Sequence, residues 1–151
     1  LKADAAGGVE AVNADDYADL KGFRVLLVED NDLNVMIAEE FLHDVGIETT
    51  TAENGLEAIK YIDEAFKAGY RPPFDLVLMD LQMPTMDGYE AAKRLRYNPD
   101  YANMPIIAMT AHAMEEERQR CLACGMNEHL TKPIDVVELY ATLRRFLVKN
   151  R

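Results

Sequence analysis

Five short apolar runs alternate with segments of helical periodicity along most of the chain, and this alternation limits the folds available to it. Each run is rich in Val, Ile, Leu, Met or Thr, which is typical of parallel strands buried on both faces. The runs are Val25–Val28, Ile47–Thr51, Leu76–Met79, Ile106–Met109 and a weaker one near Glu128–Leu130.

Between the runs, apolar residues recur with the i, i+3, i+4 spacing of helices that bury one face. Gly46, Gly69 and Gly125 follow three of these segments and Pro99 follows another, and both residue types commonly end helices. The fourth helix is expected over Glu115–Ala123. The apolar positions of the others are Leu33, Met36, Ile37, Phe41, Leu42 and Val45; Leu56, Ile59, Ile62 and Phe66; Tyr89, Ala92 and Leu95; and Val136, Tyr140, Leu143 and Leu147.

Five strands alternating with five helices predict an α/β fold with a doubly wound, five-stranded parallel sheet. Right-handed crossovers place helices on both faces of such a sheet. Ligands then bind outside the carboxyl ends of the strands, so the residues that follow each strand are the candidates for function.

The first 21 residues differ in composition from the rest of the chain. They are rich in Ala, Asp and Gly, hold five acidic residues against two basic ones, and lack a stripe that could bury a core face. We therefore expect a linker or tail over residues 1–21, with room for a short helix around Asp15–Leu20, and one domain over residues 22–151. The first residue is Leu rather than Met, which indicates a piece of a longer chain.

Composition excludes several classes of protein. The 16 Lys and Arg stand against 27 Asp and Glu, and this net charge of −11 argues against a nucleic-acid partner. No apolar run approaches the ~20 residues of a membrane span, and no signal peptide opens the chain. Cys121 and Cys124 are too few for a disulfide scaffold, so a cytoplasmic location is expected. Because they lie near the end of a predicted helix and no second pair completes a zinc site, we interpret them as structural.

Charged and polar residues follow four of the five runs. Glu29 and Asp30 follow the first run, Asp80 the third, Thr110 the fourth and Lys132 the fifth. Each alone would be an ordinary loop or surface residue, but at one edge of a parallel sheet they form a candidate site. Three carboxylates in one place repel each other unless a hard cation binds them, and Mg²⁺, with Mn²⁺ as an alternative, suits oxygen ligands better than zinc does.

A lysine and a threonine beside such a cluster are the groups that hold an anion. An ammonium group can pair with the anion, and a hydroxyl can donate a hydrogen bond to it. Metal, ammonium and hydroxyl around a carboxylate nucleophile make a pocket for a phosphoryl group.

Four stretches carry these residues: VLLVEDNDLNV (25–35), LVLMDLQMPTMDGYEA (76–91), IIAMTAHA (106–113) and HLTKPI (129–134). In this order and spacing they resemble the receiver domain of two-component response regulators, over about residues 22–148. VEDN, MDLQMPTMDG and TAHA are most similar to the C-terminal receivers of hybrid sensor histidine kinases. The resemblance implies a flavodoxin-like fold with strand order 2-1-3-4-5.

The resemblance also implies the roles of the acidic residues. Asp80 would accept a phosphoryl group from a phosphohistidine in a Mg²⁺-dependent reaction. Asp30, Asp80 and the main-chain carbonyl of Gln82 would bind the metal, with Glu29 assisting through water. Gln82 and His112 occupy positions that tune the lifetime of the phosphoryl group.

Lys132 and Thr110 would bond phosphoryl oxygens, Thr110 after reorienting. Pro133 would follow the family's unusual, cis peptide bond, and Gly88 would permit a tight turn in the loop over the acceptor. The switch position three residues before the lysine is aromatic in the family but is His129 here. An imidazole can charge near neutrality, so this position departs from the usual aromatic switch.

The implied function is a switch and not an enzyme with an external substrate, because the domain would catalyse only its own phosphorylation and dephosphorylation. The donor would be a phosphohistidine of a histidine kinase or phosphotransfer domain. A downstream partner would read the face formed by Glu115–Ala123, Glu128–Leu130 and Val136–Leu147, with no direct contact to nucleic acid or membrane. A parent chain could carry the kinase and be membrane-anchored.

Two alternatives stay open. One is a receiver-like interaction module that is never phosphorylated, although the complete set of acidic, hydroxyl and lysine groups argues against it. The other is a phosphatase of the haloacid dehalogenase type, which needs a second aspartate two residues after the first, where this chain has Gln82. A nucleotide-binding fold is disfavoured because the chain has neither a GxxxxGK loop nor a GxGxxG turn.

Overall fold

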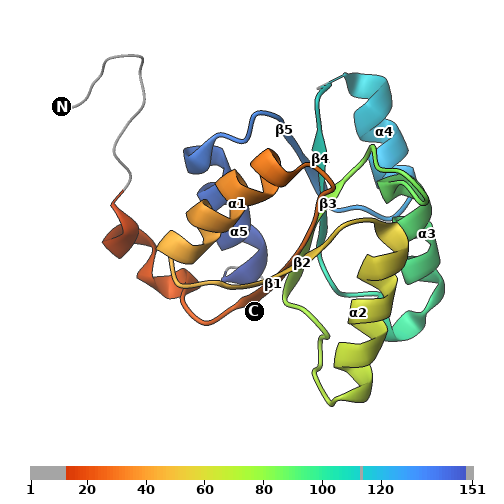
Figure 1. The fold of residues 1–151 in the computed structure, drawn as a ribbon, viewed down its shortest axis with the longest axis horizontal. Helices are drawn as coiled ribbons and strands as arrows, with labels where there is room; N and C mark the ends of the chain where they lie inside the picture. The colour runs from red at the N-terminus through yellow and green to blue at the C-terminus, as the bar shows by residue number, and fades with distance from the viewer. Residues whose placement is uncertain (1–12, 113, 149–151) are drawn as a thin grey trace.

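The computed structural model describes residues 13–112 and 114–148, and they form an α/β sandwich (Figure 1). Its five strands are all parallel and lie in the order β2-β1-β3-β4-β5, which confirms the predicted fold and strand order. The strands are β1 (Arg24–Val28), β2 (Glu48–Ala52), β3 (Leu76–Asp80), β4 (Ile106–Thr110) and β5 (Glu128–Thr131).

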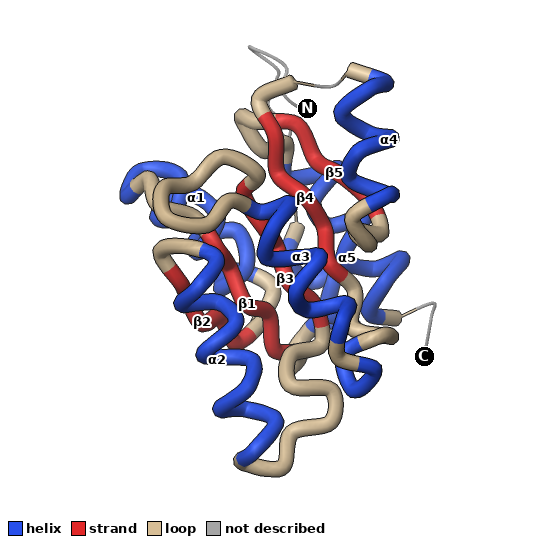
Figure 2. Tube along the Cα trace, turned by 90° about the vertical axis from the view of Figure 1, so that its right-hand side faces the viewer, coloured by secondary structure: helices blue, strands red, loops and turns tan. Residues whose placement is uncertain are grey.

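Helices cover both faces of the sheet. The helices are α1 (Asp32–Asp44), α2 (Gly55–Lys67), α3 (Gly88–Tyr97), α4 (Glu115–Ala123) and α5 (Val136–Leu147). One core cluster joins the sheet to α1 and α5, and a second joins it to α2, α3 and α4. Figure 2 shows the sheet from the side of α2, α3 and α4.

Two of the three interior strands, β3 and β4, are buried along their whole length because both of their faces are covered. Every residue of β3 and β4 is buried, and alternate side chains enter the two cores. Leu78, for example, lies in the core under α1 and α5, whereas Met79 lies in the core under α2, α3 and α4. Burial on both faces explains why these strands read as continuous apolar runs.

The apolar stripe predicted for the first helix is only partly buried. Ala38 and Leu42 are the buried residues of α1, while Leu33 and Met36 are each 62% exposed and Ile37 is also exposed. The expectation that all of these apolar positions face the core is therefore wrong for the first half of the helix. Its apolar arc is wider than the strip that the sheet can cover, so one edge of the arc faces solvent.

A 3-10 helix over Ala14–Leu20 packs against α5. Leu20 is fully buried, the ring of Tyr17 lies 4.7 Å from that of Tyr140, and Arg144 pairs with Asp19 at 3.1 Å. This part of the predicted linker is folded onto the domain, whereas residues 1–12 lie outside the described residues. The boundary at residue 22 stays a prediction. Within the described part of the chain, we find no helix with both the length and the apolar character needed to cross a bilayer.

Candidate functional site

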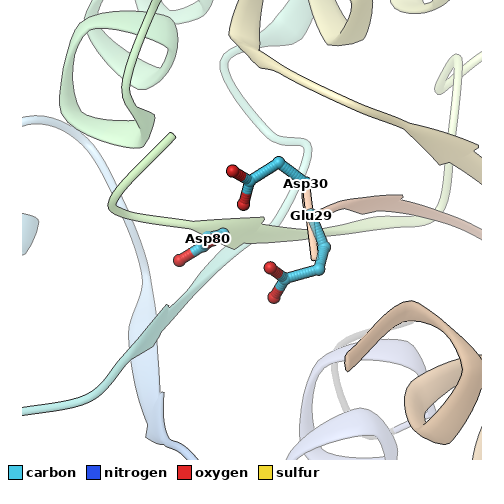
Figure 3. Close-up of side chains that lie close together, drawn as sticks. All are labelled: Glu29, Asp30 and Asp80. Carbon is cyan, nitrogen blue, oxygen red and sulfur yellow. The ribbon is translucent and has the colours of Figure 1, made fainter. Parts of the chain in front are cut away.

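Three carboxylates gather at the carboxyl edge of the sheet. Glu29 and Asp30 follow β1, Asp80 ends the neighbouring β3, and one oxygen of each lies within 4.8 Å of the others (Figure 3). Glu29 and Asp80 are each 3% exposed, whereas Asp30 is open to solvent. The predicted acidic cluster is therefore formed.

Strand register brings these residues together. Val28 of β1 pairs with Met79 of β3, so the next residue of each strand reaches the same edge. Asn31 then caps α1, its side chain accepting a bond from the Asn34 N–H, and this cap turns the chain away from the site. Each acidic residue is thus held by a strand on one side and a fixed turn on the other.

Gly88 supports the loop after β3 in a different way from the one expected. A Cβ at this position would lie 2.5 Å from the carbonyl oxygen of Asp80, so glycine allows the start of α3 to approach β3 closely. The residue with a left-handed backbone in this loop is Thr85, at φ 71°. Close approach, not a tight turn, is therefore the reason for glycine at position 88.

Lys132 bridges two of the carboxylates. Its Nζ lies 3.1 Å from Glu29 Oε1 and 3.0 Å from Asp80 Oδ1. The backbone N–H of Lys132 donates to the Thr110 carbonyl at 2.7 Å, which fixes the lysine at the end of β5. The bond between Lys132 and Pro133 is cis, as the resemblance implied.

Thr110 and Gln82 complete the wall of one open pocket. Both line it together with the three carboxylates and the lysine, Thr110 from the end of β4 and Gln82 from the loop after β3. The Gln82 N–H donates to Asp80 Oδ1 at 3.3 Å. The residues that the sequence placed at four separate strand ends therefore form one site.

The surroundings of Asp80 make its carboxylate hard to ionise in the absence of a cation. Burial, with the nearby charge of Glu29, raises the pKa of Asp80 to about 6, although Lys132 opposes the rise. Burial alone would lower the pKa of Lys132, but its bonds to Asp80 and Glu29 raise it. A single ammonium group therefore does not compensate the whole cluster.

The donor set fits a hard divalent cation. The cluster offers carboxylate oxygens and contains no histidine or cysteine, which matches the preference of Mg²⁺ and not that of zinc. Glu29, Asp30 and Asp80 are the residues that would hold it. The role of the Gln82 main-chain carbonyl as a further ligand stays a prediction.

Other predicted residues lie at the margins of the site. His112 is exposed in the loop after β4, and its N–H donates to the Thr110 hydroxyl at 3.0 Å. His129 is half-buried on β5, with Nδ1 3.7 Å from a Glu128 oxygen. Neither lines the acidic pocket. Their roles in lifetime and switching stay predictions.

The two cysteines lie away from this pocket, at the end of α4. Cys121 and Cys124 are both buried and unbonded to each other. Burial is the main cause that raises the pKa of the Cys121 thiol, and the charge of Glu117 adds to it. A thiol held protonated in a core is a poor nucleophile, which agrees with the structural interpretation.

One contact in this region was missed by the sequence analysis. The Thr110 hydroxyl donates a hydrogen bond to Glu117, a residue in the first turn of α4. In the sequence, Glu117 is one of three consecutive glutamates at a predicted helix start, where acidic residues commonly favour the helix dipole. No signal in the sequence separates it from its two neighbours.

The fold and site are those of a known family. The model of the response regulator receiver domain matches residues 25–144 of this chain, so the chain belongs to the response regulator receiver domain family. Sensor protein GacS of Pseudomonas syringae pv. syringae is 40% identical over 119 residues, which are 77% of this chain and 12% of that protein. The chain spans 12% to 14% of the lengths of GacS and similar histidine kinases.

Solved structures of receiver domains are also similar to this chain. One is the receiver domain of sensor histidine kinase PA1611 from Pseudomonas aeruginosa PAO1, whose structure has a magnesium ion coordinated in the active site cleft. Its sequence is 36% identical to this chain, and the TM-score is 0.70. The match covers 83% of this chain and 98% of that one. A co-crystal structure of the Saccharomyces cerevisiae histidine phosphotransfer protein Ypd1 with the receiver domain of Ssk1 gives 31% identity and a TM-score of 0.72, covering 85% and 90%. The predicted resemblance to receivers, including those of histidine kinases, is confirmed.

Proposed function

We propose that this chain is a phosphoacceptor in a phosphorelay and that Asp80 takes a phosphoryl group from a phosphohistidine. The observation that carries the proposal is the placement of Asp80 itself. Its carboxylate is almost fully buried, lies within 4.8 Å of two other carboxylates and contacts the Lys132 ammonium at 3.0 Å. Such a carboxylate is poorly stabilised as a bare anion, and a phosphoryl group with its counter-charges suits the pocket.

The transfer has a simple balance of bonds. An oxygen of Asp80 attacks phosphorus and forms the O–P bond, while the P–N bond to the donor histidine breaks and its electron pair returns to the imidazole nitrogen. Lys132 then pairs with a phosphoryl oxygen in place of one carboxylate contact, and Thr110 donates its hydroxyl to another. A bound Mg²⁺ would supply the positive charge that the single lysine cannot.

The exposed apolar residues of α1 support a protein donor. Leu33, Met36 and Ile37 are exposed in the first half of α1, the helix that follows Glu29 and Asp30, and Ile37 lines a second pocket with Glu29 and Lys132. We name Leu33, Met36 and Ile37 the α1 patch. An apolar patch next to a phosphoryl site suits docking of a helical surface that carries the phosphohistidine. The complex of Ypd1 with the Ssk1 receiver is the precedent for such a partner.

The output surface belongs to the same proposal. We propose that a downstream partner reads the face of α4, β5 and α5, that the domain works in the cytoplasm, and that a parent chain carries a histidine kinase. The similarity to GacS supports the last point. A wholly different output, through DNA or membrane binding by the domain itself, has no support in the net charge of −11 of the whole chain.

Replacing the acceptor tests the proposal directly. Asp80→Asn removes the nucleophilic oxygen and should reduce labelling by a phosphohistidine donor or by acetyl phosphate to background. Asp44→Asn, an exposed change at the end of α1, is the matched control and should label normally. The product should be acid-stable but sensitive to hydroxylamine, as acyl phosphates are. Hydroxylamine-sensitive labelling retained in Asp80→Asn would exclude Asp80 as the acceptor.

Two further assays separate the proposal from its two alternatives. An inert module would show no Mg²⁺-dependent change when titrated with beryllofluoride, an analogue of the phosphoryl group. A phosphatase would hydrolyse phosphate monoesters over many turnovers. Gln82 stands where that class needs its second aspartate, so we expect no such turnover.

A further inference from the structure

The hydroxyl that should bind the phosphoryl group is occupied in this structure. The Thr110 side chain donates to a Glu117 carboxylate oxygen, lies 3.1 Å from the His112 carbonyl and accepts a bond from the His112 N–H at 3.0 Å. A hydroxyl has a single proton to donate. Glu117 and a phosphoryl oxygen on Asp80 must therefore compete for it.

Glu117 has a second neighbour that lacks a partner. Tyr89 is 7% exposed as a whole residue. Its hydroxyl is buried and forms no hydrogen bond among the residues that the structure describes. Tyr89 and Glu117 line one pocket between the loop after β3 and the start of α4. Burial is the main cause that raises the pKa of Tyr89, and the charges of Cys121 and Glu117 and the closeness of the Glu117 carboxylate add to it. The Tyr89 hydroxyl therefore keeps its proton and lies near Glu117, although no hydrogen bond of full geometry joins them.

Neighbouring residues hold Tyr89 in place on this side of Glu117. The Arg120 guanidinium lies 3.8 Å from the centre of the Tyr89 ring and is engaged with its face. Tyr89 is held rigidly, because it lies in the first turn of α3 and is buried in the core shared with α4. A buried hydroxyl without a partner costs stability, so an acceptor that moves toward it is stabilised.

We infer that Glu117 is a positioning residue with two alternative partners, and this inference rests on the proposed function. Without phosphate, Glu117 holds the Thr110 hydroxyl on the α4 side. When the phosphoryl group on Asp80 takes that hydroxyl, the Glu117 carboxylate turns to the Tyr89 hydroxyl and draws the start of α4 toward α3. Glu117 would thus set the balance between the two states and couple the acceptor to α4.

The inference is tested by the affinity for beryllofluoride at saturating Mg²⁺. Glu117→Gln weakens the competing acceptor, and the apparent affinity should rise about five-fold. Tyr89→Phe removes the alternative donor, and the affinity should fall about three-fold. The affinity for Mg²⁺ alone should not change in either variant, because neither residue contacts the three carboxylates.

Two controls separate positioning from charge. Glu116→Gln removes the same charge from the neighbouring exposed position and should leave the beryllofluoride affinity unchanged. Raising the ionic strength should not remove the effect of Glu117→Gln, because salt screens a through-space charge and not a local hydrogen bond.

A double-mutant cycle gives the deciding readout. In a Thr110→Val background there is no hydroxyl to hold, so Glu117→Gln should have no further effect on beryllofluoride affinity. An undiminished effect in that background, or equal effects of Glu116→Gln and Glu117→Gln, would overturn the inference. If the unaltered chain does not bind beryllofluoride, the proposed function fails instead. Binding by the unaltered chain with no change in the variants refutes only the role of Glu117.

Discussion

The two helices that begin beside the acidic pocket, α1 and α4, differ in the chemical character of their exposed surfaces. The α1 patch is apolar and exposed, whereas α4 opens with Glu115, Glu116 and Glu117 and buries only Cys121. Behind its patch, α1 is anchored by Ala38 and Leu42. The difference supports separate roles for the two helices in the proposed function: α1 would receive the donor, whereas α4, with fewer buried residues, would need less free energy to move.

The largest expected effect is a loss of stability when a residue that anchors α1 to the core is shortened. Leu42→Ala should lower the free energy of unfolding by about 3 kcal/mol, because Leu42 is fully buried on the core-facing side of α1. Leu122→Ala on α4 is the matched change at a residue that is 44% exposed, and it should cost at most about 0.5 kcal/mol. Urea unfolding measures both. Equal losses would mean that α4 is anchored as firmly as α1.

The pocket that the two helices share is the next test. Lys132→Ala leaves Glu29 and Asp80 buried side by side, and without divalent cations it should destabilise the fold by about 2 kcal/mol, since the lysine is only partly buried. Mg²⁺ should recover much of the loss because it neutralises the same carboxylates. Thermal unfolding with and without Mg²⁺ measures this. A variant as stable as the parent in EDTA would contradict the charge balance described above.

Two exposed methionines sharpen the contrast between the surfaces. Met36 on α1 is 62% exposed and Met114, just before α4, is 60% exposed. Met36→Glu places a charge in the apolar patch and should slow phosphoryl transfer from a phosphohistidine protein about ten-fold. This corresponds to an increase of about 1.4 kcal/mol in the activation free energy of transfer. Met114→Glu should have little effect. Labelling by acetyl phosphate should not change in either variant. Equal slowing by both changes would show that the patch is not the docking surface.

The smallest expected effect lies on the face of α4, β5 and α5, which we propose as the output surface. Burial alone would raise the pKa of Glu128, but the 2.9 Å bond from Arg145, the His129 N–H and nearby positive charge lower it below 4.5. A carboxylate with a lowered pKa stabilises the fold above pH 4.5, and this contribution is lost as pH falls through the folded-state pKa.

Glu128→Gln should therefore cost less than about 1 kcal/mol at pH 7 and nothing near pH 2. Stability curves of both proteins against pH should converge at the acid end. A difference that stays constant across this range would assign the effect to packing and not to the ion pair.

Much of this arrangement could be read from the sequence because it depends on local patterns. Buried parallel strands are short apolar runs, and their ends are marked by Glu29, Asp80, Thr110 and Lys132. Parallel pairing alone then brings these residues to one edge. The second strand was predicted as a buried run over Ile47–Thr51, but β2 begins one residue later, lies at the edge of the sheet and buries only Ala52.

What could not be read depends on distances between elements. Periodicity identifies the apolar arc of α1 but not how much of it the sheet covers, so the exposure of Leu33 and Met36 was missed. The contact of Glu117 with Thr110 crosses from a strand end to a helix and has no fixed spacing. Leu20 is a single apolar residue in a polar segment, and only tertiary packing shows that it belongs to the core.

The hydroxyl of Tyr140 donates to the Phe41 carbonyl at 2.6 Å, and the same ring lies against Tyr17. This one side chain fastens α5, α1 and the entering 3-10 helix into a single body. A donor docked on α1, as we propose, would therefore also be coupled to the segment that leads into β1. We therefore expect a rearrangement on phosphorylation of Asp80 to occur in the other half of the molecule, around α4, while α1, α5 and the 3-10 helix keep their positions.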